Sequence, residues 1–101
     1  MSNHYEIKIH LVRGVSVKSD PSPVLHIGDT VRYSSPDGAA RVNFPAGSPY
    51  AVSKVHDTHN HTVKKPGHFR YECYVTPKGK TQEIGWNPKH PKAGGEHEVV
   101  P

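Results

Sequence analysis

The sequence contains only one cysteine and one methionine in 101 residues. A single cysteine excludes an internal disulfide and any metal site built from several thiolates. No apolar run approaches the roughly 20 residues that a membrane-spanning helix needs, so we expect no membrane span. The first residues lack the basic segment and apolar run of a secretory signal. This fits a cytoplasmic protein, or a periplasmic or secreted one whose leader has been removed.

Catalytic motifs are also missing from the sequence. There is no G-x-S-x-G elbow, no P-loop, no H-E-x-x-H and no dinucleotide fingerprint. Glu72 and Glu83 form no recognisable acid/base pair. Aromatic residues make up only 8% of the chain. One outward-facing group of basic and aromatic side chains could bind a single-stranded nucleic acid, but Glu72 lies among them. We therefore expect a protein that is not an enzyme and does not bind nucleic acid.

Positive charge is in excess, with a formal net charge of +4 and a pI of about 9.3. Most of the excess lies between residues 54 and 92, where eight lysines and arginines accompany three acidic residues. A basic surface steers a domain toward acidic molecules. We expect a monomer whose partner is a protein or another acidic molecule.

Short alternating segments separated by turn residues indicate an all-β fold. Ten prolines and nine glycines punctuate the chain, which suits short strands and disfavours long helices. Period-2 alternation predicts about seven strands, near residues 5–11, 24–27, 30–34, 41–44, 62–65, 66–76 and 96–100. In the second strand Leu25 and Ile27 are expected to face inward, and in the undecided segment 50–60 Tyr50 and Val55 are candidates to pack. The sequence therefore predicts one antiparallel sandwich domain over residues 1–101.

The strand at 66–76 carries the cysteine. After the Pro66-Gly67 turn, Phe69, Tyr71, Cys73 and Val75 alternate with His68, Arg70, Glu72 and Tyr74. Successive side chains of a strand point to opposite faces, so the first set is expected to build the core and to bury Cys73.

Four stretches resemble the cupredoxin family (plastocyanin/azurin-type domains). The run Val24-Leu25-His26-Ile27-Gly28-Asp29-Thr30-Val31 resembles its "GD-x-V" turn and core strand, and Arg41-Val42-Asn43-Phe44-Pro45 its "HxVxF" strand. Pro66-Gly67-His68-Phe69-Arg70-Tyr71-Glu72-Cys73 matches the strand that delivers the copper-binding cysteine, and Glu98-Val99-Val100 the closing strand. The resemblance spans about residues 23–100 and implies a cupredoxin-like Greek-key β-sandwich.

The type 1 copper site of that family combines two histidines, a cysteine and a weak axial ligand. Only Cys73 carries over. The first histidine position falls near Ala39, Ala40 or Arg41, no histidine follows closely after Cys73, and the sole methionine is Met1. We therefore expect no blue-copper site, and we interpret Cys73 as a small apolar core residue.

Nine histidines suggest metal binding as an alternative. The densest group is His56, His59 and His61, and His68 or Cys73 would complete a shell for zinc or copper. The spacing matches no specific zinc signature, so we expect no cofactor, with copper or zinc at this cluster as the alternative. His4, His10 and His26 are expected to face outward, and His90 and His97 to lie at the surface.

The segment 77–95 before the last strand is long, polar and rich in Lys, Gly and Pro, and it is expected to form a loop. It contains Trp86, Lys89, His90 and Lys92, which we interpret as a candidate recognition loop. Trp86 either packs into the sandwich and pins the loop or is exposed as an anchor for a partner; we favour pinning. The sequence thus predicts a non-catalytic cupredoxin-like binding module.

Overall fold

The computed structural model describes residues 2–12, 16–20, 23–56, 59–86 and 93–101. These residues form β-strands and no helix, which confirms the all-β prediction. The strands are β1 (His4–Val12), β2 (Ser16–Asp20), β3 (Leu25–His26), β4 (Thr30–Ser34), β5 (Gly38–Asn43), β6 (Lys54–His56), β7 (His61–Thr62), β8 (Gly67–Pro77), β9 (Ile84–Gly85) and β10 (Gly94–Val100). Within the described residues, no helix is long and apolar enough to cross a membrane.

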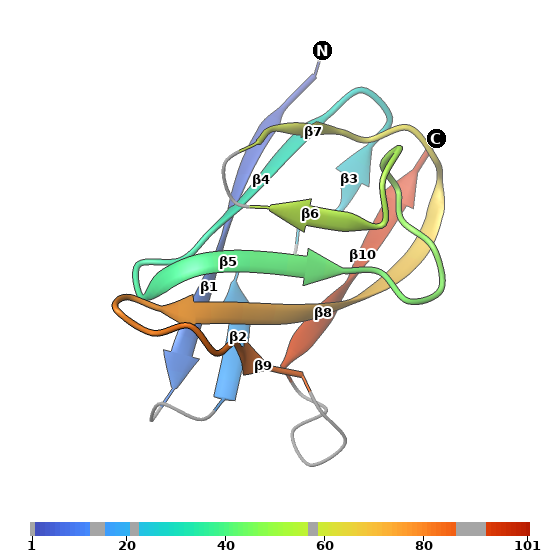
Figure 1. Cartoon of the computed structure of the whole chain (residues 1–101). Helices are drawn as coiled ribbons and strands as arrows, with labels where there is room; N and C mark the ends of the chain where they lie inside the picture. The colour runs from blue at the N-terminus through green and yellow to red at the C-terminus, as the bar shows by residue number, and fades with distance from the viewer. Residues whose placement is uncertain (1, 13–15, 21–22, 57–58, 87–92) are drawn as a thin grey trace.

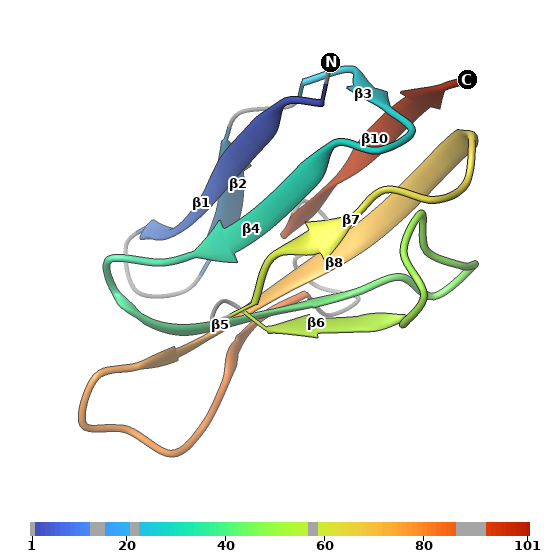
Figure 2. The ribbon, with the colours of Figure 1, turned by 90° about the horizontal axis from the view of Figure 1, so that it is seen from above.

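The strands form two mixed sheets that pack face to face (Figures 1 and 2). The smaller sheet has the order β2-β1-β4-β7, and β1 and β4 run parallel. The larger sheet has the order β3-β10-β8-β5-β6, with β3 parallel to β10 and with β9 added beside β8. The other pairs are antiparallel. Parallel neighbours cannot be joined by a tight turn, so the chain crosses repeatedly between the two sheets.

The core lies between the sheets, and the alternation predicted from the sequence accounts for most of it. Ile7 and Ile9 of β1 and Val31 of β4 are fully buried on the smaller sheet. On the larger sheet Tyr71, Cys73, Val75, Val42 and Val99 face them. Tyr50 and Val55, the packing candidates of segment 50–60, are also buried. Each Å² of apolar surface that is removed from water stabilises the fold by about 25 cal/mol. This buried layer is therefore the main stabilising element of the domain.

The prediction of an antiparallel sandwich is wrong in part, because both sheets contain a parallel pair of strands. The structure departs from the sequence-based expectations at three further places. Ile27 is 47% exposed because Gly28 turns the chain there with φ = 97°, directly after the two-residue strand β3. His97, which was expected at the surface, is fully buried, because it lies in phase with Val99 on the inner face of β10. The segment 77–95 is not a continuous loop, since β9 pairs with β8 and β10 already begins at Gly94.

Candidate functional site

The edge of β8 changes neighbour at Cys73. On one side of this residue β9 is the neighbour, with Gly85 opposite Tyr74, and on the other side β10 is, with Gly94 opposite Glu72. The backbone of Cys73 bonds both segments: its N–H donates to the Ala93 carbonyl (2.9 Å), and its carbonyl accepts from the Trp86 N–H (3.1 Å). Trp86 and Ala93 are therefore both held at the same residue of β8. We call Cys73 with Gly85, Trp86, Ala93 and Gly94 the Cys73 junction.

Two glycines allow this close approach of three chain segments. A Cβ atom at Gly85 would collide with the Cys73 carbonyl, and one at Gly94 would collide with the Tyr71 carbonyl. Both obstacles are backbone atoms, which cannot move aside as a flexible side chain can. The side chains beside these glycines complete the anchor: Ala93 is 1% exposed, and the partly buried Trp86 packs against the core. Trp86 therefore lies as the pinning alternative expects.

The Cys73 thiol is a core group. It is fully buried, and burial raises its pKa to about 12, so the thiol stays protonated at neutral pH. Val42 of β5 lies opposite Cys73 in the register. Of the residues near the position of the missing copper histidine, Ala40 is buried opposite Val75, and Arg41 points to the outer face and contacts Glu83. A buried thiol that stays protonated is a weak nucleophile and a weak metal ligand.

Within the predicted metal set, the structure does not bring His68 and Cys73 together. His68 is on the outer face of β8, where its Nδ1 lies 3.0 Å from Glu96 Oε1, while Cys73 faces the core. His59 and His61 do meet, with ring centroids 6.3 Å apart. His56 belongs to β6, and its side chain lies outside the described part of the structure. Among the described residues, no three His, Cys, Asp or Glu side chains are close enough to hold a metal ion.

Of the recognition loop, only Trp86 is described. Lys89, His90 and Lys92 lie outside the residues that the structure describes, so the structure does not test their role. The two ends of their segment are nevertheless placed, because Trp86 and Ala93 are both bonded to the backbone of Cys73.

A buried polar chain crosses the core, and it was not predicted from the sequence. The Tyr33 hydroxyl lies 2.7 Å from the Tyr50 hydroxyl and 2.8 Å from His97 Nε2. The His97 ring stacks on Tyr71 at 4.7 Å, and its Nδ1 has no hydrogen-bond partner among the described residues. Burial lowers the pKa of His97 to about 4, so the imidazole is neutral at pH 7. The alternation of His97 with Val99 was the signal that could have placed it inside.

Charged side chains are paired across the outer face of the larger sheet. Arg41 contacts Glu83 through two hydrogen bonds, of 2.8 and 3.0 Å, and its guanidinium lies 4.1 Å from the centroid of the Tyr74 ring. Glu72, only 6% exposed, accepts hydrogen bonds from Asn43 (3.0 Å) and from the Tyr74 hydroxyl (3.2 Å). The Glu83 carboxylate therefore neutralises the Arg41 guanidinium on this face.

The chain was compared with protein-family models, with curated proteins and with solved structures, and no match was found.

Proposed function

We propose that this protein is a non-catalytic interaction module on a cupredoxin-like sandwich, and that it presents the basic segment 86–93 to an acidic protein partner. The observation that carries the proposal is the Cys73 junction. There the thiol faces the core and the backbone polar groups of Cys73 are bonded to both ends of the segment. Cys73 acts as a structural anchor in this proposal, and no type 1 copper site forms.

The sheet topology supports the cupredoxin-like part of the proposal. The two sheets enclose one core, and the segments that carry the resemblance fall on core strands: the "GD-x-V" stretch leads into β4, and the cysteine stretch is β8. The chain also passes from one sheet to the other at the β2–β3, β3–β4, β4–β5, β6–β7 and β7–β8 connections, as it does in a sandwich with Greek-key connections.

The charge of the segment supports the acidic partner. Lys89, His90 and Lys92 follow Trp86 closely in the sequence, and the partly buried Trp86 fixes the point at which they begin. A short basic segment with both ends anchored loses less conformational freedom on binding than a free tail would. Electrostatic attraction would then supply the association rate and much of the specificity.

Charge reversal tests the proposal. The double variant Lys89→Glu/Lys92→Glu should weaken binding of a hexaglutamate probe at low salt by about tenfold, because attraction between opposite charges drives the encounter. Lys64→Glu/Lys65→Glu, on the connection between β7 and β8, makes the same change in net charge and should weaken binding less than about twofold. Equal effects of the two double variants would refute a specific role for the segment. An intense visible absorption band on addition of Cu²⁺ would refute the loss of the copper site.

Zinc or copper binding is a second candidate function, favoured by the contact between His59 and His61. Their rings lie 6.3 Å apart, and two imidazoles can supply half of a tetrahedral zinc shell. Calorimetric titration of metal-free protein with Zn²⁺ and Cu²⁺ tests it. Stoichiometric submicromolar binding that His59→Ala/His61→Ala abolishes and His4→Ala leaves intact would support this function. Binding weaker than micromolar would rule it out.

A further inference from the structure

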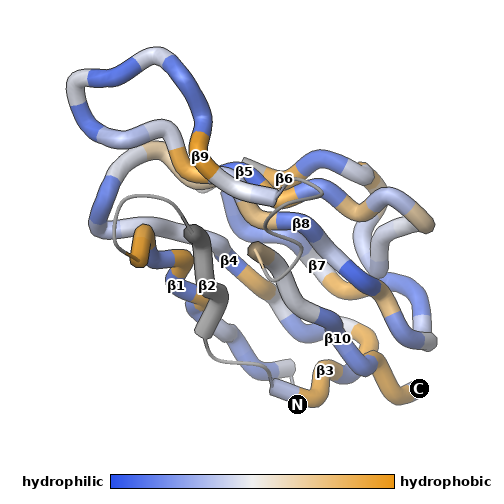
Figure 3. The backbone as a smooth tube through the Cα atoms, turned by 90° about the horizontal axis from the view of Figure 1, so that it is seen from below, coloured by the Kyte–Doolittle hydropathy of each residue, from blue (hydrophilic) through white to orange (hydrophobic). Residues whose placement is uncertain are grey.

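The hairpin between β8 and β9 projects beyond the two sheets (Figures 1 and 2). We call its residues 77–84 the arm. At its base Val75 pairs with Ile84, and Tyr74 pairs with Gly85. The tip is hydrophilic and the base at β9 is hydrophobic (Figure 3). Protein–protein interfaces commonly have an apolar centre surrounded by a polar rim. The apolar base and the polar tip of the arm have this arrangement.

Three sets of contacts outside the β8–β9 pairing hold the arm. The Lys80 N–H donates to the Pro77 carbonyl (3.0 Å) and closes the turn, while the Lys78 N–H donates to the Asp37 carbonyl (3.1 Å) in the β4–β5 connection. The guanidinium group of Arg41 in β5 donates two hydrogen bonds to the Glu83 carboxylate. The arm is therefore ordered before any partner arrives, which lowers the entropic cost of binding to it.

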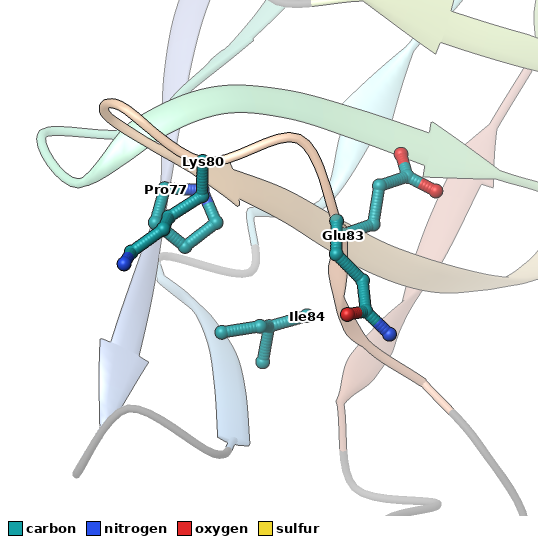
Figure 4. A pocket seen from close by; sticks show the side chains of 5 residues that line it. Pro77, Lys80, Glu83 and Ile84 are labelled. Carbon is teal, nitrogen blue, oxygen red and sulfur yellow. The ribbon is translucent and has the colours of Figure 1, made fainter.

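Below the arm lies a surface hollow of about 390 Å³, lined by Pro77, Lys80, Gln82, Glu83 and Ile84. Its lining is mainly apolar, and the Pro77 ring and the Ile84 side chain border it (Figure 4). Glu83 turns away toward β5, where Arg41 holds it. The hollow is large enough for one aliphatic side chain with its backbone, and its apolar floor favours such a group over a polar one.

The rim of the hollow is positive. Lys78 and Lys80 are both exposed, and neither ammonium group forms an ion pair with any residue that the structure describes. The acidic group of the lining, Glu83, is neutralised by Arg41. A ligand at this hollow therefore meets the Lys80 ammonium group above an apolar floor and no uncompensated carboxylate from the described lining, with Lys78 on the same arm two residues away.

We propose that the hollow beneath the arm binds an extended acidic segment of a partner protein. One aliphatic side chain of that segment lies against Pro77 and Ile84, and a carboxylate next to it pairs with Lys80. This inference rests on the proposed function, from which it takes the acidic character of the partner. A single nucleic acid strand would also be drawn to the lysines, but the lining contains no aromatic ring on which a base could stack.

Backbone amide shifts of the full chain, titrated with blocked pentapeptides at low salt, test this proposal. The probe has one leucine between two pairs of glutamates, and the matched probe has serine in place of leucine. We expect the leucine probe to shift the amides of residues 78–84 and to bind about fivefold more tightly than the serine probe, since part of the leucine is buried. Lys80→Glu should weaken binding of the leucine probe about fivefold, and the matched change Lys64→Glu less than about twofold.

Each other outcome overturns the proposal. Equal affinity for the two probes means that the hollow takes no side chain, and equal effects of Lys80→Glu and Lys64→Glu mean that only net charge matters. Tighter binding of oligothymidylate than of the leucine probe at the arm would assign the site to nucleic acid.

The two proposals fail separately. If only Lys89→Glu/Lys92→Glu weakens binding, the segment is the site and the hollow is not; if only Lys80→Glu does, the reverse holds.

Discussion

Acidification should destabilise this protein through His97, the wholly buried histidine of β10. The groups that contact its ring are Tyr33 of β4, Tyr71 of β8 and Phe44, and the Tyr33 hydroxyl is in turn bonded to Tyr50 of the β5–β6 connection. Among the described residues, no carboxylate contacts the ring to compensate a positive charge. Protonation would also leave one ring N–H, at Nδ1, without an acceptor among these residues. The folded state therefore resists protonation of His97.

The size of the effect follows from the pKa of His97, which burial lowers from 6.5 to about 4. The unfolded chain takes up the proton near pH 6.5, whereas the folded chain takes it up only near pH 4. Between these values the unfolded state binds more protons, so the free energy of unfolding falls as the pH falls. Each pKa unit is worth about 1.4 kcal/mol, so the full loss is about 3 kcal/mol. That is a large fraction of the 5–15 kcal/mol typical of a small domain.

Urea unfolding at pH values from about 7.5 down to 4.5 measures this loss. Trp86 is the only tryptophan, and because it is half-buried its fluorescence reports unfolding without interference. The variant His97→Phe keeps an aromatic ring against Tyr71 and removes the titration, so its stability should change less with pH than that of the native protein. His10→Gln removes an outward-facing histidine of β1 and should leave the native pH dependence unchanged.

A direct observation keeps the prediction testable if His97→Phe does not fold. The imidazole resonances of His97 in the native protein should stay those of a neutral ring down to about pH 5, because burial lowers the pKa of this side chain to about 4. Titration of His97 between pH 6 and 7, or equal pH dependence of the native protein and His97→Phe, would refute the reasoning.

Three further changes test other parts of the structure. Tyr33→Phe removes the hydroxyl shared by two buried partners and should cost about 1–3 kcal/mol in urea unfolding, whereas Tyr5→Phe at the rim of the core should cost less than about 0.5 kcal/mol. A double-mutant cycle on Arg41→Ala and Glu83→Ala should give a coupling of about 0.5–1 kcal/mol that shrinks in high salt, and no coupling at low salt would contradict the doubly hydrogen-bonded geometry of the pair. The Cys73 thiol should react with a soluble disulfide reagent no faster than the chain unfolds, because burial covers the sulfur and raises its pKa to about 12; rapid labelling of native protein would contradict this.

The strands that could be predicted are those long enough to show alternation. β1 and β8 carry four inward apolar or aromatic positions each at period 2, and the structure confirms that Ile7, Ile9, Tyr71 and Val75 are buried. Two-residue strands such as β3 and β9 are too short to show a period. This explains both the wrong assignment of Ile27 to the core and the missed pairing of β9 inside the expected loop.

The polar chain in the core was missed for a different reason. Its members are residues whose type is common at surfaces, and only the tertiary fold brings Tyr33, Tyr50 and His97 together from three distant parts of the sequence. The pattern of β10 did place His97 in phase with Val99, but the histidine was assigned to the surface because of its residue type. Partners of a buried polar group are a property of the packed structure, which no local pattern encodes.

The Cys73 junction supports the proposal that the strand carrying Cys73 anchors a segment and does not bind copper. Val42 lies opposite Cys73 in the register, and Ala93, whose carbonyl accepts the Cys73 N–H, is buried. A metal bound by the thiol would need nitrogen ligands from neighbouring inner-face positions, and neither of these two side chains supplies one. The Trp86 N–H donates to the Cys73 carbonyl, and the partly buried Trp86 packs against the core. We therefore propose that Cys73 holds both ends of segment 86–93 through its backbone while its thiol fills the core.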